Sequence, residues 1–246
     1  MRLRRSAIGQ LLGAAVFGIA IILSSEPGVC GGEQESELMR HLHLDGTQLD
    51  LRGTRTGDEQ LASLRAPQFR NVTRLLLSGT RVTDAGMAYV RHLPLEELDL
   101  YRTAITNRGV AAVRGMPLRK LNLSSTGIGD DALVYLNGMP LEILSLRHTQ
   151  ITDNGLVLLS DLPLKYLDVS NTRITGENFA VLGQIDRLKD LDISGTKLTH
   201  YGIERLANLP RETRVYLADT GVTDNELARL RELRPDLRLV VETPTR

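Results

Sequence analysis

Most of this chain of 246 residues is built from one short pattern, repeated at a nearly constant spacing. The pattern has two apolar residues at alternate positions and a threonine three residues after the second. One unit of this length cannot bury its own apolar side chains, whereas stacked units can, so the repeat predicts a solenoid over residues 49–236. Successive threonines lie 23 to 26 residues apart, at Thr54, Thr80, Thr103, Thr126, Thr149, Thr172, Thr196 and Thr220.

Each unit carries the signals of a short strand followed by a short helix. Leu98 and Leu100 alternate with polar residues and therefore lie on one face of a strand. Thr83 and Asp84 provide a hydroxyl and a carboxylate for the free N–H groups at a helix start. Apolar residues at three-residue steps then form one buried stripe, and a proline turns the chain back. Stacking such units predicts parallel strands on an inner, concave side and helices on an outer, convex side.

The run Leu-x-x-Leu-x-Leu-x-x-Thr at residues 95–103, 118–126, 141–149 and 164–172 resembles the leucine-rich repeat. Its length and helical side are similar to the ribonuclease-inhibitor-like class, which includes repeats of bacterial exported and F-box-associated proteins. The resemblance implies an α/β fold, a right-handed solenoid of about eight repeats with a parallel concave sheet and convex helices. One departure is the threonine, where the family often has Asn or Cys. We expect these hydroxyls to form a ladder of bonds to loop backbone, because a buried hydroxyl needs a partner.

The ends of the chain differ from the repeats. Residues 1–30 have a basic start and a 17-residue apolar run, Ala7 to Leu23, which is typical of a signal peptide or an N-terminal membrane anchor. Cleavage, retention as an anchor and lipidation at Cys30 all stay open. Each predicts an exported protein of the periplasm, cell envelope or extracellular space. Residues 31–48 are expected to form an N-terminal cap, and residues 237–246 a C-terminal cap strand and tail.

Composition argues against several function classes. A formal net charge of zero does not favour nucleic acid as a partner. Aromatic residues make up 4%, with no Trp, and there is one Cys, so neither an aromatic cofactor cavity nor a Cys-rich zinc site is expected. The five His have no zinc-like spacing, and His200 merely replaces the Asp that usually caps the helix. We expect no enzyme, no cofactor and no metal.

The outward residues of the predicted sheet are the candidate contacts for a protein partner. Tyr and Arg most often carry binding energy at interfaces. The alternative for each residue is a solvated face without a partner. The candidates on the concave face are Tyr101, Arg102, Ile143, Arg147, His148, Tyr166 and Tyr216.

Carboxylates gather on the same face and form a possible acidic patch, Asp99, Asp168, Asp190 and Asp192. Asp168 and Asp192 should be cross-strand neighbours, and like charges there repel. Three interpretations stay open: a divalent cation, a basic partner, or screening by water and nearby cations.

The leading hypothesis is a non-catalytic interaction module, monomeric, in contact with a membrane only through an uncleaved or lipidated N-terminus. A substrate-recognition subunit of a ubiquitin-ligase-like complex, as the F-box resemblance suggests, is one alternative. Residues 31–48 are too few for the adaptor-binding helices that this role needs. A self-associating structural protein of the envelope is the other alternative.

Overall fold

The computed structural model describes residues 31–241. The predicted signal or anchor at residues 1–30 and the tail at residues 242–246 lie outside the described residues. Within residues 31–241, no helix has the length and apolar character needed to cross a membrane.

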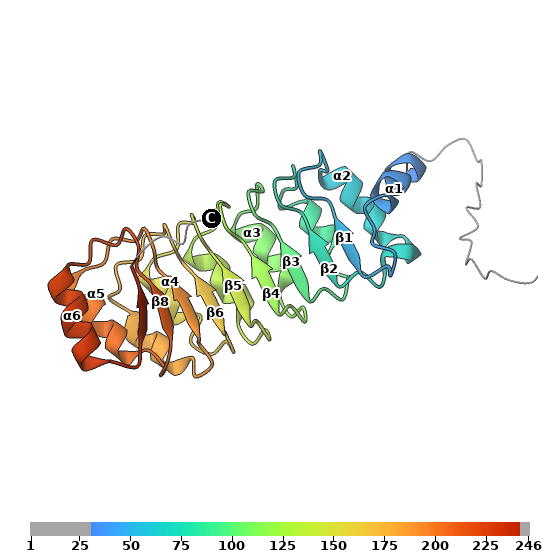
Figure 1. Ribbon diagram of the computed structural model, residues 1–246. Coiled ribbons are helices and arrows are strands. Elements are labelled where there is room, and N and C mark those ends of the chain that lie inside the picture. Colours follow the sequence, from blue (N-terminus) through green and yellow to red (C-terminus); the bar gives the residue numbers. More distant parts are fainter. Residues whose placement is uncertain (1–30, 242–246) are drawn as a thin grey trace, which may run out of the picture. The chain divides into compact units, whose positions relative to one another are not determined.

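Nine parallel strands form one sheet, and each strand pairs with the one before it in the chain (Figure 1). This order is what stacked repeats produce, and it confirms the predicted α/β fold with its parallel sheet. The strands are β1 (Gln48–Asp50), β2 (Arg74–Leu76), β3 (Glu97–Asp99), β4 (Lys120–Asn122), β5 (Ile143–Ser145), β6 (Tyr166–Asp168), β7 (Asp190–Asp192), β8 (Arg214–Tyr216) and β9 (Arg238–Val240).

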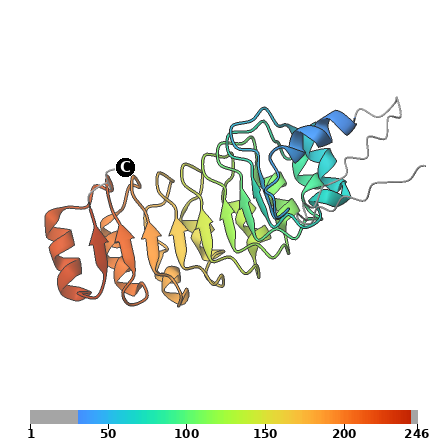
Figure 2. The same ribbon diagram turned by 45° about the vertical axis from the view of Figure 1, so that its right-hand side comes forward.

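Short helices lie on one side of this sheet, and Figures 1 and 2 show the other side without helices. The α-helices are α1 (Gly31–Met39), α2 (Asp58–Leu61), α3 (Asn107–Val110), α4 (Asp153–Val157), α5 (His200–Arg205) and α6 (Asp224–Leu233). The 3₁₀ helices are η1 (Ala62–Arg65), η2 (Pro67–Phe69), η3 (Gly86–Tyr89), η4 (Ala111–Val113), η5 (Asp130–Leu136), η6 (Phe179–Gln184) and η7 (Leu206–Asn208). Much of the helical side is therefore 3₁₀, because each repeat leaves only one or two turns between its strands.

One apolar core fills the space between the sheet and the helices. Leu98 of β3 and Leu100 just after it are at most 1% exposed, and Met87 of η3 and Val90 just after it are fully buried. The alternating pair and the three-residue stripe thus face each other as predicted. Burying each such side chain stabilises the fold by about 1.5–3 kcal/mol.

All eight repeat threonines donate their hydroxyl hydrogen to the backbone carbonyl three residues earlier, at 2.5 to 2.7 Å. The expected bonds to loop backbone are therefore present. They do not join one repeat to the next, because each lies within its own repeat and closes the turn after the strand. Thr149, for example, is buried and bonds to Leu146 O.

A second hydrogen-bond set joins consecutive repeats on the helical side. The Asp58 carboxylate accepts the N–H of Thr83 at 2.8 Å with one oxygen and its hydroxyl at 2.6 Å with the other. Asp130 accepts the same two groups of Thr152, also at 2.8 and 2.6 Å. The helix-start Asp therefore binds the next repeat as well as beginning its own helix. Asp84 with Thr106 and Asp153 with Thr175 form the other pairs.

One repeat pair replaces Asp and Thr together. Asn107 stands in the Asp position, and its Oδ1 accepts the N–H of Gly129 at 2.8 Å. An amide side chain has a single acceptor oxygen, and glycine brings no hydroxyl for a second bond. The substitution on one repeat is thus matched by the substitution on the next.

The same carboxylates explain a recurring glycine. A Cβ on Gly155 would lie 2.4 Å from Asp130 Oδ1, and a Cβ on Gly109 would lie 2.4 Å from Asp84 Oδ1. At these two positions, the third residue after the repeat's helix-start Thr, the close approach of the carboxylate leaves no room for a Cβ. Ala132 occupies this position in the repeat that follows Asn107, where an amide stands in place of the carboxylate.

The first strand is covered by an antiparallel segment. His43 N donates to Gln48 O at 2.8 Å and Asp50 N donates to His41 O at 3.1 Å. Residues 42–47 of the expected N-terminal cap therefore turn back on β1 as a hairpin. Leu38 of α1 is 1% exposed and joins the core. At the other end, α6 and β9 complete the stack.

We expect Thr149→Val to lower the free energy of unfolding by about 1–2 kcal/mol, because the buried Leu146 carbonyl loses its hydrogen-bond donor. Thr149→Ser keeps the hydroxyl and is the matched control. Denaturant unfolding of the three proteins measures the difference. An unfolding midpoint for Thr149→Val equal to that of the unmodified protein would show that the hydroxyl bond contributes nothing.

Candidate interaction surface on the sheet face

The strand register places the outward side chains in straight columns across the sheet. Ser145 pairs with Asp168 and Asp168 with Asp192, and Tyr166 pairs with Asp190 in the neighbouring column. The pairing of Asp168 with Asp192 confirms the cross-strand neighbours predicted from the repeat. Neighbouring parallel strands lie about 4.8 Å apart, so residues in one column can contact the same ligand.

An open hollow of about 860 Å³ lies on this face, and we call it the sheet-face hollow. Six predicted residues line it: Tyr101, Arg147, His148, Tyr166, Asp168 and Asp192. Seven residues that the prediction did not select complete the lining: Asn122, Ser124, Ser145, Asn171, Ser194, Gly195 and Asp219. The hollow exists because several of these side chains are short.

The other five predicted residues do not line the hollow. They are Arg102, Ile143 and Tyr216 among the candidate contacts, and Asp99 and Asp190 of the acidic patch. Arg102 lies beside the hollow, with its guanidinium carbon 6.0 Å from the centre of the Tyr101 ring. Asp190 is paired with Arg214 at 3.1 Å, and Arg214 also lies 3.4 Å from the Tyr216 hydroxyl.

The floor of the sheet-face hollow is a hydrogen-bonded network centred on Asp168. One carboxylate oxygen accepts the N–H of Ser170 at 2.9 Å and its hydroxyl at 2.6 Å. The other accepts the Ser145 hydroxyl at 3.2 Å, and Ser145 lies 2.7 Å from the Ser124 hydroxyl. Asp168 is 8% exposed and Ser170 is fully buried. The floor is therefore held in place before any ligand arrives.

Burial and charge both act on the ionisable groups of this floor. Burial raises the pKa of Asp168, and the nearby Asp192 carboxylate adds to the rise while the bonds from Ser170 and Ser145 oppose it. Burial, followed by the Asp168 charge, raises the pKa of the Tyr166 hydroxyl. Tyr166 is therefore a neutral hydrogen-bonding group at physiological pH.

The aspartates of the sheet face have a local structural role. Asp99, Asp168 and Asp192 each accept the N–H of the residue two positions later, at 2.9 to 3.0 Å. Asn122 does the same at 3.0 Å. These bonds shape the turn after each strand and account for Asp or Asn in this column. Among residues 31–241, no three His, Cys, Asp or Glu side chains are placed to hold a metal ion.

The turns beside the hollow contain residues in the left-handed conformation. His148, Asn171 and Asp219 have φ of 53°, 55° and 58°. This conformation lets His148 N donate to Ser170 O at 3.0 Å and Asn171 N donate to Ser194 O at 2.8 Å, which extends the ladder beyond the strands. It costs roughly 1–2 kcal/mol for a residue other than glycine. The sequence indicates this left-handed conformation through Gly53, Gly79 and Gly195, which stand at the same position of other repeats.

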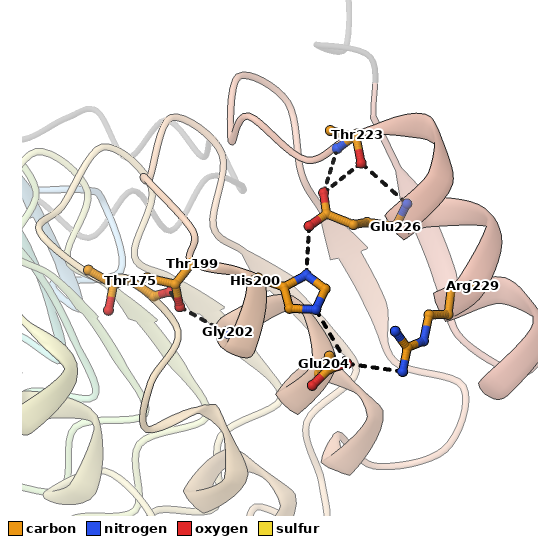
Figure 3. Close-up of polar contacts among 8 residues, drawn as sticks. All are labelled: Thr175, Thr199, His200, Gly202, Glu204, Thr223, Glu226 and Arg229. Carbon is orange, nitrogen blue, oxygen red and sulfur yellow. Dashed lines mark hydrogen bonds and ion pairs between the residues drawn. The ribbon is translucent and has the colours of Figure 1, made fainter.

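A second polar cluster joins helices α5 and α6 on the helical side (Figure 3). His200 Nδ1 lies 3.0 Å from Glu226 Oε1, and His200 Nε2 lies 3.6 Å from Glu204 Oε1. Arg229 reaches the same Glu204 oxygen at 3.1 Å. His200 therefore links two repeats instead of capping its helix, and Thr199 caps α5 by accepting the N–H of Gly202 at 3.0 Å.

Glu226 also completes a capping box at the start of α6. Its carboxylate accepts the N–H of Thr223 at 2.9 Å and the Thr223 hydroxyl at 2.7 Å, and its own N–H donates back to that hydroxyl at 3.3 Å. The Thr223 N–H, the His200 ring and the Thr223 hydroxyl together lower the pKa of Glu226 to about 2. The cluster therefore stabilises the end of the repeat stack.

A family model of the leucine-rich repeat matches residues 116–136 and 139–160. No curated protein matches the chain.

Several solved structures resemble it. Internalin C2 of Listeria monocytogenes is 24% identical, with a TM-score of 0.56 over 80% of this chain and 80% of its own. A chain of the mouse RP105/MD-1 complex is 20% identical, with a TM-score of 0.59 over 79% of this chain and 33% of its own. A leucine-rich-repeat protein of Leptospira interrogans is 21% identical, with a TM-score of 0.54 over 78% and 54%. This chain thus spans a third of the mouse chain and about half of the Leptospira chain, and the likeness shows the fold.

The lowered pKa of Glu226 predicts an acid-dependent contribution to stability. Because its folded pKa of about 2 lies below the ordinary value of 4.5, the ionised carboxylate stabilises the fold above pH 4.5 and loses this effect as the pH falls toward 2. We expect Glu226→Gln to destabilise the protein by about 0.5–1 kcal/mol at pH 7, with an effect that shrinks below pH 4.5 and disappears only below about pH 2. Unfolding midpoints across this range measure the difference. Glu232→Gln, on the same helix, is the matched control, and a Glu226→Gln effect independent of pH would contradict the prediction.

Proposed function

We propose that this leucine-rich-repeat protein binds a protein partner on its sheet face and catalyses no reaction. The observation that carries the proposal is the sheet-face hollow. Tyr101 is 38% exposed, and Tyr166, Arg147 and His148 are placed with it around a floor that is already hydrogen-bonded. Large aromatic and Arg side chains over a preorganised floor are the features of an interface with high binding energy.

The similarities support the same class of function. The family match and the solved structures indicate a protein–protein interaction module. One of the similar chains was solved as part of a complex of two proteins, RP105 and MD-1. The type of partner and the face used are the parts that we propose for this chain.

The contacts in the hollow support binding over catalysis. The Ser145 hydroxyl donates to Asp168 at 3.2 Å and lies 2.7 Å from the Ser124 hydroxyl. Throughout residues 31–241, the histidine rings that bond to other groups reach a backbone carbonyl or a carboxylate, and none reaches a serine. A serine nucleophile is most often activated by a histidine base, and these contacts place none beside a serine.

A photo-crosslinking residue in place of Ser145 tests the proposed face. In cells of the source organism, we expect it to capture one protein, while the same residue in place of Val157, which is 47% exposed on the helical side, captures none. The captured protein is then purified for titration. Combined replacement of Tyr101, Arg147 and Tyr166 by Ala should weaken its binding at least about tenfold, because each removes an anchor of the hollow.

The control for this variant replaces Tyr201 and Arg231, which are exposed on the helices, by Ala and should leave the affinity unchanged. Light scattering of each protein should give the mass of a monomer. Equal affinities of the two variants would show that the partner binds elsewhere.

We also propose that the protein is exported through residues 1–30. The support is the sequence of this segment, in which Arg2, Arg4 and Arg5 precede the apolar run. Fractionation of cells that express the full chain with a C-terminal tag, followed by the intact mass, tests it. We expect a species shortened by about thirty residues, or a membrane-bound one of full or lipidated mass. Full-length protein in the soluble cytoplasmic fraction would contradict export.

A further inference from the structure

A second hollow adjoins the sheet-face hollow where the strands end, and we call it the loop-edge hollow. Its volume is about 510 Å³. It shares His148, Asn171 and Gly195 with the sheet-face hollow, so the two form one continuous surface. The remaining lining residues are Thr172, Arg173, Ile174, Thr175 and Lys197.

The charge of the loop-edge hollow is of one sign. Arg173 and Lys197 are exposed, and no carboxylate belongs to the lining. Each follows the repeat threonine of its own turn, so the two cations stand in equivalent positions of neighbouring repeats. Parallel strands lie about 4.8 Å apart, so the two side chains leave neighbouring stretches of backbone, and like charges on neighbouring strands repel. An anion between them would remove the repulsion.

Three cations of the sheet strands have carboxylate partners within the protein. Arg74 and Lys120 lie 2.9 and 3.7 Å from Glu97, and Arg214 lies 3.1 Å from Asp190. In the part of the chain that the structure describes, no carboxylate lies within 4.0 Å of Arg173 or Lys197. Their charges are therefore available to a ligand.

The nearby carboxylate and backbone groups are already used. Asp153 accepts the N–H and hydroxyl of Thr175, both at 2.8 Å, and the N–H of Gly176 at 2.9 Å. The N–H groups of His148 and Asn171 donate to the next repeat. Recognition at the loop-edge hollow thus falls to the cationic side chains, which form their strongest hydrogen bonds with charged acceptors.

We propose that the loop-edge hollow binds a short carboxylate-bearing segment of the partner protein; this rests on the proposed function. A protein segment fits better than a nucleic acid because the adjoining sheet-face hollow contains Asp168, Asp192 and Asp219. A long polyanion would be repelled there, whereas a polypeptide can place acidic residues over Arg173 and Lys197 and other residues over the sheet. The partner would then be acidic at one end of its contact with this chain.

A labelled hexaglutamate peptide tests the site directly by fluorescence anisotropy with the full chain. We expect saturable binding at about 20 mM salt that weakens strongly at about 300 mM, because exposed charges are screened. Replacing Arg173 and Lys197 together by Glu should weaken it at least about tenfold. The matched control replaces Arg55 and Arg81, which follow Thr54 and Thr80 in the first two repeats, by Glu and should change the affinity by less than about twofold.

Four results would overturn the inference: no binding of the peptide at millimolar concentration, equal loss in both variants, equal binding of hexalysine, or tighter binding of a single-stranded oligonucleotide of equal charge. Replacing Arg173 and Lys197 by Gln provides a second variant with less repulsion, and thermal unfolding confirms that each is folded. The photo-crosslink at Ser145 reports separately on the proposed function. If the crosslinker at position 145 captures a protein but the chain with Arg173 and Lys197 intact binds no hexaglutamate, only the acidic-segment inference is overturned.

Discussion

Hydrogen bonds between consecutive repeats hold this structure together, because no repeat can supply partners for the backbone N–H and C=O groups of its own strand. Leu100 N donates to Asn122 O at 2.9 Å and Arg102 N donates to Ser124 O at 3.1 Å, so the ladder continues past the last residue of each strand. On the helical side, carboxylates such as Asp130 bond to the threonine of the following repeat. The spacing of the outward columns, and with it the shape of both hollows, follows from these two sets of bonds. A solenoid of this kind gains stability through nearest-neighbour contacts.

The repeat, the buried leucines and the columns of the sheet face could be predicted, because they depend only on the period of the chain. The threonine hydroxyl bonds could be predicted in kind, since a buried hydroxyl needs an acceptor, but their closure within one repeat could not. The bond from Asp58 to Thr83 was missed because an Asp beside a Thr also has a complete local explanation as a helix start. Which neighbour a carboxylate reaches depends on three-dimensional spacing that one sequence does not contain.

The candidate site was predicted in part for a related reason. Outward residues such as Tyr101 and Tyr166 follow from the register, and they line the sheet-face hollow. The hollow itself depends on short side chains such as Ser124 and Ser145, which carry no individual signal. Asp168 was expected to be a surface charge, but it is 8% exposed and organises the floor. The left-handed turn at His148 recurs at the same position of other repeats, as at Arg102 and Asn171, because it continues the hydrogen-bond ladder past the strands.

The pairing of Asp with Thr sets a chemical condition on four of the junctions between repeats. A repeat that carried Gly in place of Thr152 and followed Asp130 would leave one carboxylate oxygen without the hydroxyl that it now binds. At the junction from Asn107 to Gly129, one bond from the amide oxygen serves instead. Repeats of equal length in this chain therefore differ in the bonds by which each holds the next. Duplication or shuffling of single repeats would keep both bonds of a carboxylate only at junctions where Asp meets Thr.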